Sequence, residues 1–85
     1  MSKYDETLEI ISHASRMKMA LNSHKGAIEN LDPATAAKLL QEEVQEMLAA
    51  IAADDHEKAI VEAGDAINFL VALAYNSIGK YRKRK

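Results

Sequence analysis

Five carboxylates in the middle of the chain are candidates for binding a metal ion or catalysing a reaction. They are Glu42, Glu43, Glu46, Glu62 and Asp65. Glu46 and Glu62 lie eight residues before and after Asp54, and Glu43 and Asp65 lie eleven residues before and after it. If the two flanking segments are helices that meet at Asp54, a rise of about 1.5 Å per residue puts the members of each pair at the same distance from the turn. These carboxylates would then converge between two facing helices.

The local sequence does not neutralise this cluster. Residues three or four apart share a helix face, and Glu43, Glu46 and Asp65 have no lysine or arginine at those spacings. A solvated acidic face is the ordinary interpretation of a glutamate-rich helix, but here like charges would repel without compensation. A hard divalent cation would remove that repulsion, and a set of carboxylate oxygens suits Mg²⁺, with Mn²⁺ as a substitute.

Three helical segments are predicted to position the acids. The first runs from about Tyr4 to Asn22, where apolar residues recur near a period of 3.6. The second begins with Asp32 as N-cap and Pro33 at the first helical position. The third begins with Asp54 as its cap and ends near Gly79. Strand signals are missing, so the expected fold class is all-α, with the second and third helices as an antiparallel hairpin.

The apolar residues of the hairpin indicate more contacts than one chain supplies. The second helix carries a stripe that is expected to be buried: Leu40, Val44, Met47, Leu48 and Ile51. The third helix is apolar nearly all round from Ile67 to Leu73, which is typical of an element covered on more than one side. Because a chain of 85 residues buries a modest share of its surface alone, we expect a three-helix protomer that assembles into an oligomeric helical bundle, a dimer or a tetramer.

Composition and charge exclude several classes of protein. There is no cysteine, and therefore no disulfide framework, thiolate nucleophile or zinc–sulfur site. The start of the chain does not resemble a signal peptide, and the longest apolar stretch, residues 66–74, is too short to span a membrane, so we expect a cytoplasmic protein. Residues 1–79 form one expected domain, with six basic and thirteen acidic residues, and residues 80–85 form a basic tail. The acidic domain argues against nucleic acid as a partner.

Other metal chemistry fits the sequence less well. A di-iron bundle requires histidine three residues after glutamate, and neither His13, His24 nor His56 stands at that spacing. Glycine-rich phosphate loops and zinc spacings are also missing from the sequence.

The segments EEVQE at residues 42–46 and EAGD at residues 62–65 resemble the EExxE…ExxD signature of the MazG-like all-α nucleoside triphosphate pyrophosphohydrolases. The resemblance covers residues 17–76. It implies a Mg²⁺-dependent enzyme that cleaves a nucleoside or deoxynucleoside triphosphate between its α- and β-phosphates. It also implies four metal ligands, Glu43, Glu46, Glu62 and Asp65, and the catalytic residues Glu42 and Glu43, with Glu42 orienting or deprotonating water.

Further residues are candidates for contacts with the nucleotide. Lys18, Asn22 and Lys25 suit phosphate or sugar contacts, although solvated positions at a helix end and in a loop explain them equally well. Asn68 and Asn76 lie on the third helix beyond Asp65, and a primary amide in so apolar a segment requires hydrogen-bond partners. Those partners are either a ligand or a neighbouring helix.

Two other functions are compatible with the sequence. Phosphoribosyl-ATP pyrophosphohydrolase shares the helical signature. Small MazG-like members carry a tryptophan where this chain has Ala27 and Ile28, so the sequence does not identify the base. From a different class, a non-catalytic helical module could use its basic tail to dock on an acidic surface. A metal-dependent rise in melting temperature would favour the enzyme over the module.

Overall fold

The protein folds into three helices in the computed structural model, which describes residues 2–22 and 30–84. They are α1 (Asp5–Leu21), α2 (Pro33–Ala52) and α3 (His56–Arg84). The described residues include no strand, which confirms the all-α prediction. The first predicted helix agrees with α1 to within one residue at each end.

The start of α2 is the one that the sequence predicted. Asp32 has extended backbone angles, its side chain accepts a hydrogen bond from the backbone N–H of Ala34 at 2.9 Å, and Pro33 opens the helix. A hydrogen bond from the Thr35 hydroxyl, followed by that from Ala34, holds the pKa of Asp32 below its ordinary value. Such a cap satisfies a backbone donor that the helix itself leaves without a partner.

The turn between α2 and α3 corrects one detail of the prediction. Asp54 has a φ of 60°, in the left-handed region, and its backbone N–H donates to the carbonyl of Ile51. Asp55, not Asp54, caps α3: its side chain accepts from the N–H of Lys58 at 3.2 Å, and its carbonyl accepts from Ala59. Asp54 closes the turn instead, because aspartate tolerates the left-handed conformation better than most residues.

The predicted end of α3 at Gly79 was wrong. The helix continues through this glycine to Arg84, so residues 80–84 of the basic tail are helical. A glycine inside a helix costs about 1 kcal/mol relative to alanine but does not terminate it. Arg82, Lys83 and Arg84 lie in the last turn, where positive side chains interact favourably with the negative end of the helix dipole.

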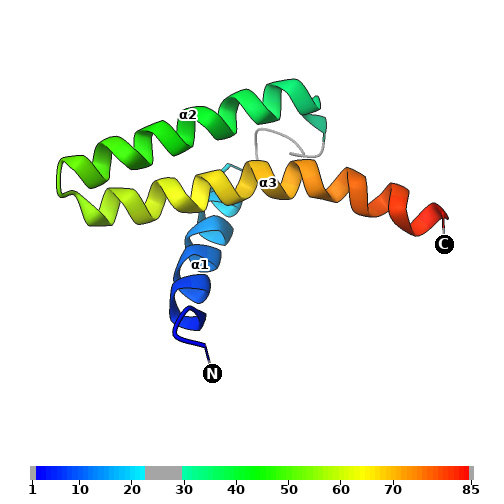
Figure 1. Ribbon diagram of the computed structural model, residues 1–85. Helices are drawn as coiled ribbons and strands as arrows, with labels where there is room; N and C mark the ends of the chain where they lie inside the picture. The colour runs from blue at the N-terminus through cyan, green and yellow to red at the C-terminus, as the bar shows by residue number, and fades with distance from the viewer. Residues whose placement is uncertain (1, 23–29, 85) are drawn as a thin grey trace.

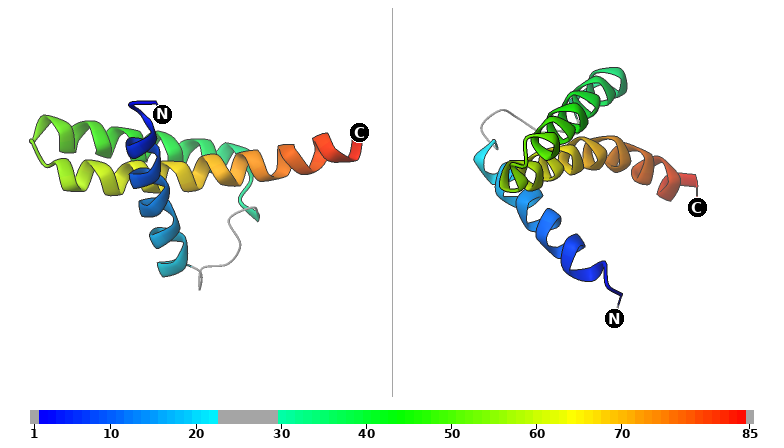
Figure 2. Two further views of the ribbon diagram at one scale, coloured as in Figure 1. Left: turned by 90° about the horizontal axis from the view of Figure 1, so that it is seen from below. Right: turned by 60° about the vertical axis from the view of Figure 1, so that its left-hand side comes forward.

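Helix α3 is the element against which the other two helices pack (Figure 1). Helix α2 lies beside the first part of α3, whereas α1 crosses α3, as the views in Figure 2 also show. Among the described residues, α1 and α2 do not pack on each other. The two contacts of α3 therefore decide which side chains of the three helices meet.

The core of the single chain is small. Among the residues that the structure describes, the buried hydrophobic ones are all alanines: Ala36, Ala50, Ala59, Ala63 and Ala72. The stripe that the sequence predicted to be buried on α2 is instead largely open, since Leu48 is 59% exposed and Val44 and Ile51 are also exposed. The reason is that α2 places Ala36 and Ala50 in its buried positions, which leaves the larger side chains outside that contact.

Helix α3 also exposes large apolar side chains in the single chain, including Leu70 at 51% and Val71. Within the described residues, no helix combines the length and the apolar character needed to cross a membrane.

Candidate metal centre

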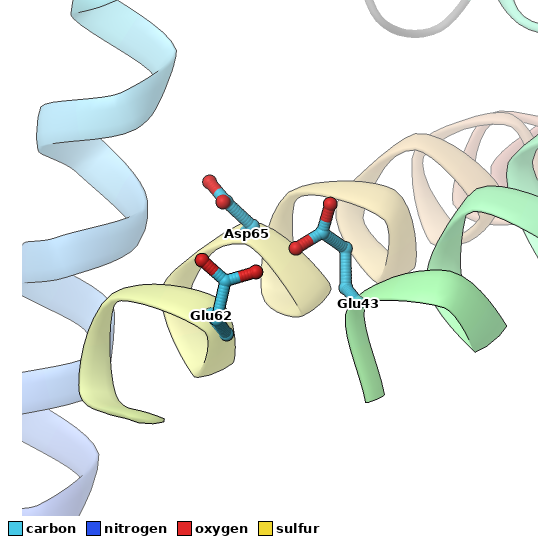
Figure 3. Close-up of side chains that lie close together, drawn as sticks. All are labelled: Glu43, Glu62 and Asp65. Carbon is cyan, nitrogen blue, oxygen red and sulfur yellow. The ribbon is translucent and has the colours of Figure 1, made fainter. Parts of the chain in front are cut away.

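Three of the predicted carboxylates come together between α2 and α3 (Figure 3). Glu43 extends from α2, and Glu62 and Asp65 lie three residues apart on α3, where that spacing puts them on a common side. One oxygen of each carboxylate lies within 4.8 Å of the others. Glu62 is buried and Glu43 and Asp65 are half-buried, so the cluster is largely withdrawn from solvent.

Burial and mutual repulsion raise the pKa values of Glu43 and Glu62. Desolvation raises the pKa of Glu43, a hydrogen bond with Glu62 opposes the shift, and the charges of Asp65 and Glu46 add to it. For Glu62, a hydrogen bond with Glu46 lowers the pKa, but desolvation, the hydrogen bond with Glu43 and the neighbouring charges outweigh it and raise the pKa overall. The negative charges of these two glutamates are therefore disfavoured without a cation.

Two oxygens in the cluster have no hydrogen-bond partner. They are Oε2 of Glu43 and Oε2 of Glu62, and both are buried. Buried polar atoms in proteins are nearly always hydrogen-bonded, so two orphaned carboxylate oxygens side by side require an explanation. A hard divalent cation provides one, because it binds carboxylate oxygens and cancels the charge that burial disfavours.

Glu46 lies at the edge of this cluster. It is exposed and does not belong to the group of three whose oxygens converge. Its hydrogen bond with Glu62 raises the pKa of Glu46, and the charge of Glu62 raises it further. The structure therefore brings three of the four predicted ligands together and places the fourth against one of them.

Lys18 supplies a positive charge that the helix spacings did not reveal. Its Nζ lies 3.7 Å from Oδ2 of Asp65, and the side chains of Lys18 and Asp65 are 35% and 16% exposed. The two residues belong to different helices, α1 and α3, so neighbours three or four positions away could not identify the pair. The expectation that Asp65 has no basic neighbour holds along its own helix and fails in three dimensions.

Asn68 forms a hydrogen bond with a neighbouring helix, which is one of the two alternatives that the sequence left open. Its Oδ1 accepts a hydrogen bond from the hydroxyl of Ser15 on α1, and both residues are buried. Ser15 was missed as a partner, although a serine within the apolar face of a predicted helix is a signal for such a bond. A role of Asn68 toward a ligand stays a prediction.

The other predicted residues lie outside the carboxylate cluster. Glu42 is exposed on α2, and Asn76 is exposed on α3, eleven residues beyond Asp65. Asn22 ends α1, where its backbone N–H donates to the carbonyl of Lys18 at 3.0 Å. Lys25 lies outside the residues that the structure describes.

One comparison with known proteins identifies a family. The family model for phosphoribosyl-ATP pyrophosphohydrolase matches residues 10–78. This range includes the three converging carboxylates, Glu46 and Lys18. A search of curated proteins and a search of solved structures gave no match. The chain belongs to the phosphoribosyl-ATP pyrophosphohydrolase family, within the MazG-like all-α superfamily of nucleoside triphosphate pyrophosphatases, whose members are hydrolases that act on acid anhydrides.

Proposed function

We propose that the protein hydrolyses a nucleoside or deoxynucleoside triphosphate between its α- and β-phosphates, in a reaction that depends on Mg²⁺ and that Mn²⁺ also supports. The products are a nucleoside monophosphate and pyrophosphate. The observation that supports this function best is the convergence of Glu43, Glu62 and Asp65 within 4.8 Å, with buried and unpartnered oxygens on the two glutamates.

The carboxylates have separate proposed tasks. Glu43, Glu62 and Asp65 hold Mg²⁺, and Glu46 completes the set from the edge through its contact with Glu62. When bound, the metal neutralises phosphate oxygens and lowers the pKa of water. Glu42, which is exposed on the same helix as Glu43, orients the attacking water or takes its proton.

The remaining candidates act on the nucleotide. Lys18 lies beside the cluster, where its ammonium group can bind a phosphate oxygen once the charge of Asp65 is shared with a metal. The proposal keeps Asn22 and Lys25 as candidates for phosphate or sugar contacts, and Asn68 and Asn76 as candidates for contacts with the nucleoside.

The family match favours a second candidate substrate, phosphoribosyl-ATP. Its scissile bond is the same α–β anhydride, so the same carboxylates serve both reactions. The additional phosphoribosyl group lies on the base, away from the triphosphate. The two candidates therefore differ in the contacts that the protein makes beyond the carboxylate cluster.

The assembly is also part of the proposal. In the proposed arrangement α2 and α3 form an antiparallel hairpin, and a second copy of the chain covers its exposed apolar residues, which include Leu48 and Leu70. Helical bundles of this kind bury apolar stripes between subunits. A dimer or a tetramer would supply the large buried side chains that the described part of a single chain lacks.

A substrate panel tests the activity. Phosphoribosyl-ATP and a set of nucleoside and deoxynucleoside triphosphates are incubated with the protein and Mg²⁺, and the products are separated. Pyrophosphate together with the monophosphate is the expected result. Orthophosphate together with a diphosphate, or no turnover of any substrate at high protein concentration, would contradict the proposal. The variant Glu6→Gln, which changes an exposed acid on α1, serves as the matched control.

A further inference from the structure

The contact between α1 and α3 lies directly beside the carboxylate cluster. Gly64 stands between Glu62 and Asp65 in the sequence, and it is buried against α1. A Cβ atom at Gly64 would lie 2.7 Å from Cβ of Ala14 and 2.9 Å from the backbone nitrogen of Ser15. Atoms do not approach so closely, so the missing side chain of Gly64 permits the observed contact. The position of α1 on α3 is therefore set at the metal site itself.

A buried polar contact fixes this position further. The hydroxyl of Ser15 donates a hydrogen bond to Oδ1 of Asn68, and the two residues are 4% and 8% exposed. A buried hydrogen bond depends on distance and direction, and breaking it leaves polar atoms without partners. Apolar contacts between alanines would allow α1 to slide or rotate on α3, whereas this bond favours one register.

The same register places Lys18. Lys18 follows Ser15 by three residues on α1, and Asp65 precedes Asn68 by three residues on α3. Residues three apart lie on the same side of a helix. The Ser15–Asn68 hydrogen bond and the Lys18–Asp65 ion pair are thus neighbouring contacts between the same two helix faces.

We propose that Ser15 is a positioning residue of the active site, which acts by holding Lys18 against Asp65 through the Ser15–Asn68 hydrogen bond. In this position the ammonium group of Lys18 balances the negative charge of Asp65 before metal binds. After metal binding, the same group can bind a phosphate of the nucleotide. The inference rests on the proposed function, because it assigns Lys18 a role toward the same metal and the same substrate.

The charge of Lys18 has two opposite consequences. An ammonium group 3.7 Å from Asp65 competes with a divalent cation for that carboxylate, so it weakens metal binding in the absence of nucleotide. The same group attracts the triphosphate, so it strengthens nucleotide binding. Removal of Lys18 should tighten Mn²⁺ binding at least about fivefold, which is the effect expected for two unit charges at about this separation in bulk water, and should raise the KM for the nucleotide.

A double-mutant cycle separates positioning from a merely structural role. Wild type, Ser15→Ala, Lys18→Met and the double variant are compared in two measurements: the dissociation constant for Mn²⁺ without nucleotide, and the KM and kcat for the nucleotide with Mg²⁺. Ser12→Ala makes the same chemical change one turn earlier on α1 and is the control. If Ser15 acts through Lys18, Ser15→Ala shifts both the Mn²⁺ affinity and the KM in the direction of Lys18→Met. It then has no further effect on either quantity in the Lys18→Met background.

The remaining outcomes distinguish this inference from the proposed function. Equal effects of Ser15→Ala in both backgrounds, or no effect on Mn²⁺ affinity and KM in wild type, would show that Ser15 supports the fold alone. If Ser15→Ala does not fold, Ser15→Cys tests the same register, because it keeps the volume of the side chain and replaces the hydroxyl with a weak donor, and the same non-additivity with Lys18→Met is expected. If the wild type neither binds Mn²⁺ nor hydrolyses nucleotides, the proposed function itself fails. If the wild type binds Mn²⁺ and hydrolyses nucleotides but the effects of Ser15→Ala and Lys18→Met are additive, the inference about Ser15 fails and the proposed function stands.

Discussion

At the scale of single residues, the carboxylates of the cluster do not share one environment. Glu43 and Glu62 have buried oxygens without partners and raised pKa values, whereas Asp65 is paired with Lys18. A substitution by the corresponding amide therefore removes repulsion at the glutamates but removes an ion pair at Asp65. The structure thus divides acids that look equivalent in the sequence.

The first prediction follows from this difference. In EDTA, Glu43→Gln is expected to melt higher than wild type, with a gain above the roughly 0.5 kcal/mol of ordinary surface changes. Asp65→Asn is expected to melt no higher than wild type, because it loses the contact with Lys18. Both variants should gain less from Mg²⁺ and lose most pyrophosphohydrolase activity. Thermal melting followed by circular dichroism, with Glu6→Gln as control, measures these changes. A Glu43→Gln variant that melts lower in EDTA and stays active would exclude the metal-site assignment.

The second prediction concerns pH. The raised pKa values of Glu43, Glu46 and Glu62 mean that the metal-free folded state binds protons more tightly than the unfolded state. Their contribution to stability is therefore complete below the ordinary glutamate pKa of 4.5. It is lost as the pH rises through the higher folded-state values. Asp32 acts in the opposite sense at lower pH, because its pKa is lowered: its contribution is present above 3.8 and lost as the pH falls.

The pH dependence is measured by melting the protein in EDTA across this range and again in Mg²⁺. Because the cation binds the ionised acids, the stabilisation by Mg²⁺ should grow with pH. In EDTA, the stability of the Glu43→Gln variant should depend less on pH than that of the wild type. A stability in EDTA that rises between pH 5 and 7 in wild type, and equally in Glu43→Gln, would contradict this account.

At the scale of elements, α3 carries two glycines with opposite roles. Gly64 allows α1 to approach closely, whereas a Cβ at Gly79 would meet nothing within 4 Å. Both positions are helical, so the difference between them comes from the neighbouring element alone.

The third prediction compares these two glycines. Gly79→Ala should stabilise the protein by up to about 1 kcal/mol, because alanine is the better helix former and no neighbour obstructs it. Gly64→Ala should destabilise it, because the new methyl group overlaps with Ala14 and Ser15. Urea denaturation of the two variants measures both effects on the same helix with the same chemical change. If Gly64→Ala and Gly79→Ala change the stability equally, α1 does not pack on Gly64 in solution.

At the scale of the whole molecule, the single chain leaves much apolar surface uncovered. Its described core consists of alanines, while larger side chains on all three helices remain exposed. Exposed apolar surface of this extent marks an interaction site. This exposed apolar surface is what supports the proposal of an assembly with a second copy of the chain.

The fourth prediction tests that assembly. Light scattering should detect a dimer or a larger species, and Leu70→Lys should weaken association because it places a charge in the apolar surface of α3. Gln41→Lys, on an exposed polar position of α2, should leave the assembly intact. A wild-type protein that is monomeric at micromolar concentration would overturn the prediction.

The all-α fold, the beginning of α2 and the paired spacing of the acids could be read from the sequence alone. These features follow from local rules: helical periodicity identifies the segments, and Asp32 and Pro33 mark a start. A constant rise per residue pairs Glu43 with Asp65 and Glu46 with Glu62 across a short turn. The end of α3 was missed at Gly79 because the tendency of glycine to terminate a helix is weak against the surrounding residues.

The packing of α1 on α3 could not be read from the sequence, and this packing gives Asp65 its counter-charge. Lys18 and Asp65 lie 47 positions apart in the sequence, and no periodicity connects them. They meet because Gly64 admits Ala14 at close range and because Ser15 bonds to Asn68. Packing between distant segments depends on the shape of both surfaces at once. The sequence could therefore predict the carboxylates, while their partners, and the division of the cluster into paired and unpaired acids, were set by the fold.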